Sequence, residues 1–328
     1  RASGPAMLIY AIVVAVALLG AWSFNVDNVL ADMRFQQGQG YIDDPRGGLD
    51  QQIVGANYLL DAIRMEPGQD FYYLSLGRSL MTMVSLRAED ARQSGVPLGE
   101  INPNANVDTL LRLNDAPALQ SFVLSQTPLE LMSYARVVLL RANELAPLNK
   151  DHAANLGRMY NFWYQNLSGS RDLNLLLQAV DWYRKAHELA PQDVTILNEY
   201  ASAVARAGDY QQAMALLEQS RALDGRFNDT VLRIGDVLRA QGRYQDAVDQ
   251  YLAAIARDRA ALDTQITTIA AALAVEPEQL LRLRAGYEQA REQYPDDARI
   301  LAIIGLLSDR AGDLEGAASA FSEVVQLQ

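Results

Sequence analysis

The feature that most constrains the fold of this 328-residue chain is a recurrence in its second half. Three tripeptides begin with glycine and end with a large residue, the second one 34 positions after the first: Gly208-Asp209-Tyr210, Gly242-Arg243-Tyr244 and Gly312-Asp313-Leu314. Self-similarity at a period of this length indicates a repeat architecture, in which each unit buries its apolar face against its neighbours. The sequence therefore predicts a helical array rather than a single globular core.

Small residues recur at fixed positions within the repeats. Those expected in the first helix of each unit are Gly157, Ala201, Gly235 and Gly305, and those in the second are Ala179, Ala213, Ala247 and Ala317. Side chains this small let two helices approach to the short end of the usual 8–10 Å separation. The glycines at 208, 242 and 312 fall between two helices, where a left-handed residue ends the first.

With these residues the array resembles the tetratricopeptide repeat (TPR), two antiparallel helices in 34 residues. The resemblance implies an all-α, right-handed superhelix, here of about seven helix pairs with insertions. In this register one unit has helices at about 194–207 and 210–223, and the next at about 228–241 and 244–257. We divide the chain into residues 1–25, degenerate units at 26–147 with an insertion near 88–126, and a regular array at 148–328.

The N-terminal segment is apolar. No charged side chain occurs from Ala2 to Val26, and a helix over Pro5–Phe24 would cover about 30 Å, the thickness of the hydrocarbon core. We therefore predict a transmembrane helix at 1–25 that contacts the lipid bilayer through residues 5–24. A cleaved signal peptide and a helix buried in an oligomer core are the alternatives.

Charge next to this segment gives an orientation. Arg1 precedes it and several aspartates follow it, so the positive-inside rule predicts a single span in the bacterial cytoplasmic membrane with the array extracytoplasmic. Because no initiating methionine is present, Arg1 is expected to be internal to a longer precursor.

Composition excludes several classes of function. The chain has no cysteine and two histidines, His152 and His187, both expected on the surface, so we predict no metal site. Forty acidic against 28 basic side chains give a net charge of −12, which argues against nucleic-acid binding. No phosphate loop or nucleophile elbow occurs, and we expect neither a cofactor nor catalytic residues in this chain.

In TPR arrays the first helices line a concave face, and the resemblance transfers that role to particular positions here. The expected ligand-binding residues are Asn155, Arg158, Asn198, Ser202, Asp236 and Arg239. Both signs of charge are present, which suits hydrogen bonding to an extended polar segment of a partner protein. Neither Lys150 nor Lys185 occupies these positions, so the lysine clamp of chaperone-binding arrays is absent.

The junction between the apolar segment and the array carries a second resemblance, over residues 8–80. Its motifs are Asn25-Val26-x-x-Val29-Leu-Ala31-Asp32-x-x-Phe35-Gln-Gln-Gly38, Met65-Glu-Pro67 and Asp70-Phe71-Tyr-Tyr73-Leu-x-Leu76-Gly77-Arg78. They resemble the C-terminal part of O-antigen ligase/polymerase-like membrane proteins, some of which carry TPRs after their last span. Two functions follow: a membrane-anchored TPR scaffold for protein–protein interaction or subunit assembly, or the partner-binding tail of a glycan-transferring membrane enzyme.

The fold class has a direct spectroscopic test. Because all recurrent features are those of helices, we expect the circular dichroism spectrum of the purified chain to be that of an α-protein. A β content above a few per cent would contradict the prediction.

Overall fold

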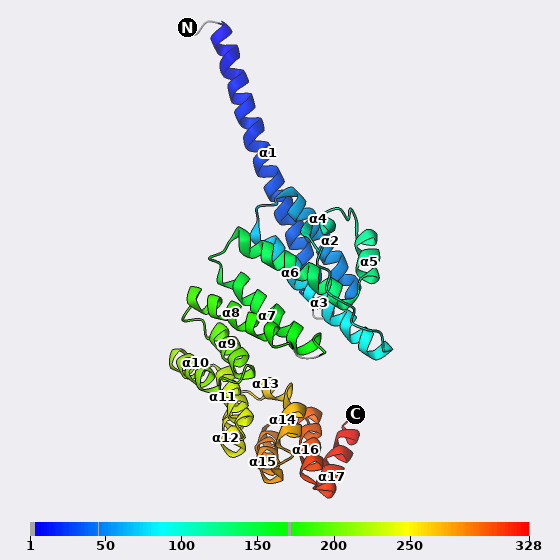
Figure 1. The fold of residues 1–328 in the computed structure, drawn as a ribbon, viewed down its shortest axis with the longest axis vertical. Coiled ribbons are helices and arrows are strands. Elements are labelled where there is room, and N and C mark those ends of the chain that lie inside the picture. The colour runs from blue at the N-terminus through cyan, green and yellow to red at the C-terminus, as the bar shows by residue number, and fades with distance from the viewer. Residues whose placement is uncertain (1–3, 45, 170–171, 328) are drawn as a thin grey trace. The chain divides into compact units, whose positions relative to one another are not determined.

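The computed structural model describes residues 4–44, 46–169 and 172–327, which form 17 helices and no strand (Figure 1). The predicted all-α class is confirmed. The chain divides into two compact units, Arg1–Leu189 and Ala190–Gln328, here called unit 1 and unit 2.

Unit 1 consists of stacked antiparallel helix pairs. Its helices are α1 (Gly4–Ile42), α2 (Leu49–Met65), α3 (Asp70–Ser94), α4 (Val107–Leu111), α5 (Ala116–Ser125), α6 (Pro128–Leu145), α7 (Lys150–Asn166) and α8 (Leu173–Leu189). α1 pairs with α2, α3 with α6 and α7 with α8, while α2 packs on α3 and α6 on α7. Each pair therefore covers the apolar face of the next one.

The two helices of the middle pair are separated by an insertion that contains α4 and α5. Helix α5 packs on α2, so the insertion covers the outside of the first pair. The chain re-enters the array at a capping box, in which the Thr127 side chain accepts from the Glu130 backbone N–H and the Glu130 carboxylate accepts from the Thr127 N–H. With Pro128 in the first turn, these bonds start α6.

Unit 2 continues the pairing with one irregular step. Its helices are α9 (Val194–Arg206), α10 (Tyr210–Leu223), α11 (Asn228–Ala240), α12 (Tyr244–Ile255), α13 (Ala260–Asp263), α14 (Ile266–Leu273), α15 (Pro277–Gln293), α16 (Ala298–Ala311) and α17 (Leu314–Gln326). α9 pairs with α10, α11 with α12 and α16 with α17. The bounds of α9 to α12 agree with the predicted helices to within two residues.

The predicted close contacts between helices are present at glycines of the first helices. A Cβ atom built on Gly157 would lie 2.8 Å from Cδ1 of Tyr183, and one on Gly235 would lie 2.6 Å from Cε1 of Tyr251. At each glycine three consecutive ring atoms lie at similar distances, so the backbone rests on the face of the ring. A Cβ on Gly305 would be 2.6 Å from Cε1 of Phe321.

The glycines between helices also adopt the predicted conformation. Gly208, Gly242 and Gly312 have φ of 95°, 75° and 84°, the left-handed region that ends a helix without a steric penalty for glycine. The first helices of these three pairs therefore stop at equivalent places.

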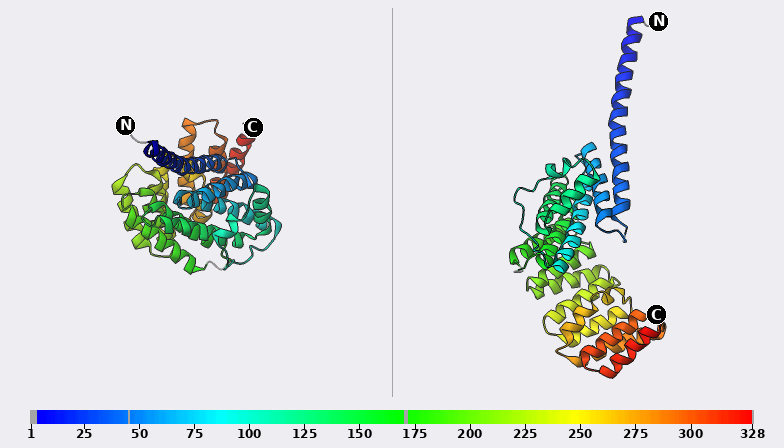
Figure 2. Two further views of the ribbon diagram at one scale, coloured as in Figure 1. Left: turned by 90° about the horizontal axis from the view of Figure 1, so that it is seen from above. Right: turned by 90° about the vertical axis from the view of Figure 1, so that its right-hand side faces the viewer.

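The predicted membrane span is wrong. α1 is one continuous helix (Figure 2), its last part packs on α2, and the side chains described between Met7 and Leu19 are exposed. Among the residues that the structure describes, no helix is long and apolar enough to cross a membrane.

This finding overturns the predicted placement in the bacterial cytoplasmic membrane with the array extracytoplasmic. The lipid contact through residues 5–24 stays a sequence prediction. After Val26, α1 carries Asp27, Asp32 and Arg34, which end the apolar character of the helix. The side chains at 5–6 and 21–25, and Arg1 itself, lie outside the described ones.

The ring contact at Gly235 predicts the effect of enlarging that residue. We expect Gly235→Leu to lower the free energy of unfolding by about 1–3 kcal/mol, because the new side chain overpacks the contact with Tyr251. The matched control is Gly225→Leu, since Gly225 is exposed and its Cβ would meet only the Arg221 carbonyl at 3.5 Å. Equal urea midpoints for the two variants would contradict the assigned helix contact.

Candidate binding surface

A hollow of about 260 Å³ lies among the first helices of unit 1. It is formed where α3 contacts both the end of α1 and α7. Its lining consists of Ile42, Asp43, Arg78, Met81, Thr82, Leu139, Asn155, Arg158 and Met159. We call this hollow the unit 1 groove. It brings together two of the predicted binding residues, Asn155 and Arg158.

Two arginines border the unit 1 groove at equivalent positions of neighbouring first helices. Arg78 follows Gly77 on α3, and Arg158 follows Gly157 on α7. Each glycine faces the second helix of its own pair, so the next residue, about 100° further around the helix, emerges on the same side in both repeats. Two arginines thereby start from equivalent positions along one face.

The rest of the lining is mixed. Leu139 and Met159 are buried and give the floor its apolar surface, while Thr82 is exposed. The Asn155 side-chain amide donates to the Asp151 carbonyl oxygen at 2.7 Å. Among the described lining residues, Asp43 is the one carboxylate beside the two arginines. The groove is thus bordered by two arginines in a chain whose net charge is −12.

In unit 2, Asn198 holds two helix pairs together. Its side chain is 1% exposed, and its amide nitrogen donates to Asp229 Oδ2 at 2.9 Å and to Thr230 Oγ1 at 3.1 Å. These bonds connect α9 to α11. Ser202 donates from its hydroxyl to the Asn198 carbonyl oxygen at 2.8 Å, within the same helix. The Asn198 amide is thus committed to the packing of the array.

Asp236 and Arg239 belong to a network centred on a buried phenol. The Tyr251 hydroxyl donates to Asp236 Oδ1 at 2.9 Å and accepts from Arg239 Nε at 3.1 Å. Arg239 also pairs with Asp236 at 3.4 Å. Tyr251 is fully buried on α12, so these bonds tie α11 to its partner helix.

The following repeat contains a similar network. The Tyr287 hydroxyl donates to Asp263 Oδ1 at 2.8 Å, and Arg259 forms an ion pair with the same carboxylate. Burial raises the pKa of the Tyr251 phenol, and the Asp236 carboxylate raises it further. Burial and then Asp263 raise the pKa of Tyr287 in the same way. Both phenols stay protonated as hydrogen-bond donors.

Sequence reasoning misplaced one histidine and missed one arginine. His152, expected on the surface, is 0% exposed, and its Nε2 lies 2.5 Å from Asp70 Oδ2 at the start of α3. Arg78 was not among the predicted residues, although the Leu-Gly-Arg tripeptide at 76–78 repeats that at 156–158 and would have indicated it. Within the described ranges, no three His, Asp or Glu side chains gather to hold a metal ion.

Comparisons with known proteins agree on the type of repeat. Residues 284–328 match the family model described as tetratricopeptide repeat. A segment of 73 residues is 33% identical to the small glutamine-rich tetratricopeptide repeat-containing protein 2 of Mycosarcoma maydis, covering 22% of this chain and 21% of that protein. The chain thus spans about a fifth of the relative that it matches.

Solved structures with a similar course of the chain include two further proteins. The thermophilic TPR protein TTC0263 of Thermus thermophilus is 17% identical, with 74% of this chain and 98% of that chain covered and a TM-score of 0.47. Yeast Tom70 is 15% identical, with 91% and 60% covered and a TM-score of 0.45. The matched repeat at 284–328 contains the α16–α17 pair, and helices pair in the same antiparallel way through the described parts of both units.

The buried phenols predict a loss of stability at alkaline pH. A phenol whose pKa is raised by folding contributes stability that is complete below about pH 10 and is lost as the pH rises toward its folded value. For each such tyrosine the free energy of unfolding should fall by about 1.4 kcal/mol per pH unit above that point. We expect Tyr251→Phe to reduce this slope in urea unfolding between pH 9 and 11.

Tyr294→Phe is the matched control, because Tyr294 is 57% exposed in the same unit. If both variants show the same dependence of the free energy of unfolding on pH as the native chain, the folded state does not raise the pKa of Tyr251.

Proposed function

We propose that this chain is an interaction scaffold whose unit 1 groove binds an extended, carboxylate-bearing segment of a partner protein. Proteins built from TPRs bind protein partners, and this chain carries such a repeat at 284–328. The proposal assigns no reaction to the chain.

The observation that carries the proposal is the alignment of Arg78 and Arg158 along the unit 1 groove. Guanidinium groups bind carboxylates through two parallel N–H···O bonds, which provide direction as well as charge. Two of them on adjacent first helices select a segment with acidic groups at a matching spacing. A partner segment lying across α3 and α7 would meet both.

The remaining groove residues have complementary roles. Ile42 and Met81, both half-buried, offer apolar surface to a side chain of the segment, and Met81 adds the flexibility of a thioether. Thr82 and Asn155 present polar groups beside the arginines. Asn198, Ser202, Asp236 and Arg239 are left out of the proposed site, because their hydrogen bonds and ion pairs serve contacts within unit 2.

The resemblance of residues 8–80 to O-antigen ligase/polymerase-like proteins remains a sequence prediction. A partner-binding tail would use the same groove, so the scaffold function does not depend on that resemblance.

The test replaces both arginines of the groove. We expect Arg78→Ala/Arg158→Ala to weaken binding of the partner by about 1–3 kcal/mol, because each loses charge-assisted bonds to carboxylates. The partner is recovered from an extract of the source cells on the immobilised native chain, and its dissociation constant is then measured for each variant.

The matched control is Arg226→Ala/Arg310→Ala, which removes the same charge from two exposed positions of unit 2. Equal affinity of the native chain and the groove variant, with both folded by circular dichroism, would contradict the assignment of the unit 1 groove.

A further inference from the structure

We propose that unit 2 contains a second binding site, a pocket between α12 and α15 that takes a short aliphatic peptide segment flanked by acidic residues. The occupant is a segment of another protein. This site lies in the other unit and on other helices than the unit 1 groove, so it extends the function proposed above and does not depend on it.

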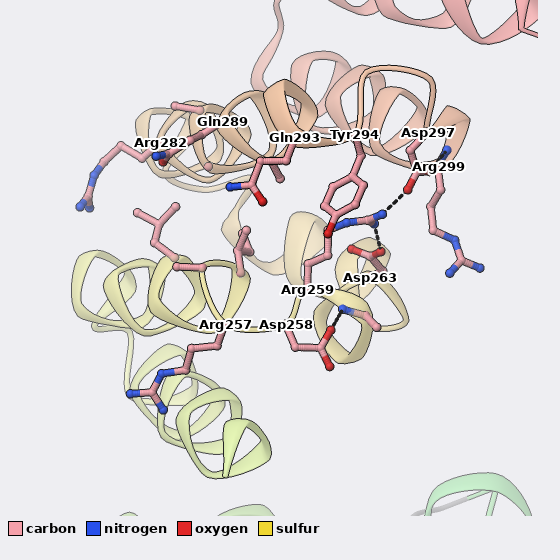
Figure 3. Close-up of a pocket in the computed structure, with 17 residues that line it drawn as sticks. Arg257, Asp258, Arg259, Asp263, Arg282, Gln289, Gln293, Tyr294, Asp297 and Arg299 are labelled. Atoms are coloured by element: carbon pink, nitrogen blue, oxygen red, sulfur yellow. Dashed lines mark hydrogen bonds and ion pairs between the residues drawn. The ribbon is translucent and has the colours of Figure 1, made fainter. Parts of the chain in front are cut away.

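The pocket has a volume of about 880 Å³, within the range of ligand-binding cavities. Its walls are the C-terminal half of α12 with the turn that follows, α15, and the start of α16 (Figure 3). All its lining residues belong to unit 2.

The pocket arises where the repeat is irregular. In the preceding pairs, a second helix packs on the first helix of the next pair, as α10 does on α11. After α12, the first helix is replaced by the short α13 and α14, and α12 packs on α15 instead. Two second helices are thereby neighbours, without a full-length helix between them to fill the space.

The floor of the pocket is apolar and made of small or aliphatic residues. Leu252 and Ile255 come from α12, and Ala285, Gly286 and Ala290 come from α15. A Cβ on Gly286 would lie 2.4 Å from Leu252 Cδ2, so the two helices touch at this point. Ala285 and Ala290 leave the adjacent surface open, and aliphatic side chains of a ligand fit there.

The rim carries arginines at both ends. Figure 3 shows Arg282 and Arg257 on opposite walls at one end, and Arg299 at the other end. Arg257 Nη1 donates to the Gly225 carbonyl oxygen at 2.9 Å. The N–H groups on Nε and Nη2 take no part in this bond. Arg282 pairs with Asp249, which lies outside the pocket.

The carboxylates of the lining have partners within the protein, and one guanidinium group serves two of them. Asp263 is 2% exposed and is held by Arg259 and by the Tyr287 hydroxyl. Asp297 also pairs with Arg259 and accepts from the backbone N–H of Arg299 at 2.9 Å. Asp258 accepts from the Ala260 N–H at 3.0 Å. Arg257 and Arg299, at opposite ends, form no ion pair among the residues that the structure describes, so these two guanidinium groups can receive the carboxylates of an occupant.

The length of the pocket fixes the size of the segment. Its lining on α15 runs from Arg282 to Gln293, about 16 Å at 1.5 Å per residue. An extended chain advances about 3.3 Å per residue, so about five residues cover this distance. Aliphatic residues at the centre of the segment then face the floor, and acidic residues at its ends reach the arginines.

The probe is a fluorescein-labelled, acetylated heptapeptide with three central leucines and two acidic residues at each end. Two further peptides replace the acidic residues by lysines or the leucines by serines. Binding to the full chain is followed by fluorescence polarisation. We expect saturable binding of the first peptide and at least about tenfold weaker binding of the other two, because charge and apolar contact are each required.

Two variants locate the binding. Ala285→Trp fills the floor, and Arg257→Glu/Arg299→Glu reverses the charge at two exposed positions of the rim, with the fold of each variant checked by circular dichroism. Each variant should bind the acidic peptide at least about tenfold more weakly than the native chain does. The matched controls are Arg310→Glu, on α16 outside the pocket, and Arg78→Ala/Arg158→Ala in unit 1, both of which should bind as the native chain does.

No saturable binding of the acidic peptide, equal binding of the lysine peptide, or unchanged binding by both pocket variants would overturn the proposal. Dimerisation of the native chain that Ala285→Trp abolishes would overturn the choice of occupant in favour of a second copy. If the acidic peptide does not bind but Arg78→Ala/Arg158→Ala still weakens binding of the partner from the cell extract, the proposal for the unit 1 groove is retained. The two proposals can therefore be contradicted independently.

Discussion

The close approach of two helices at a glycine is the contact on which the rest of this fold depends. Gly157, Gly235 and Gly305 each rest on the face of an aromatic ring from the partner helix, and Gly77 rests on Leu139. In the first pair, a Cβ on Gly38 or Gly55 would lie 2.9 Å from the carbonyl oxygen of the other glycine. The group that the glycine contacts differs between pairs: an aromatic ring, a leucine side chain or a backbone carbonyl. The short distance between the two helices is the same feature in each pair.

This spacing also positions the proposed binding surfaces. Because Gly77 and Gly157 face inward, the arginines that follow them emerge side by side and border the unit 1 groove. In unit 2, the pocket occurs where the first helix is broken into α13 and α14 and has no such glycine. Regular repeats thus align polar groups, and the irregular repeat leaves a cavity.

The sequence predicted the helix pairs well because small residues and glycine caps act locally, within one or two turns. It failed at α1, because no helix among the described residues is long and apolar enough for a span, and at His152, whose partner Asp70 lies on another helix. Counting positions along a helix placed Asn198 on the binding face but did not show that Asp229 and Thr230 reach it. The pocket of unit 2 depends on which helix packs against α12, and no short-range pattern reports that.

The most direct test of this account is the proton chemical shift of the glycines that rest on rings. A proton over the face of an aromatic ring resonates upfield of its random-coil position, so selectively labelled Gly157 and Gly235 should show upfield-shifted α-protons. The shift at Gly235 should disappear in Tyr251→Leu while that at Gly157 remains. Random-coil shifts at both glycines in the folded chain would contradict the helix contact on which the array is built.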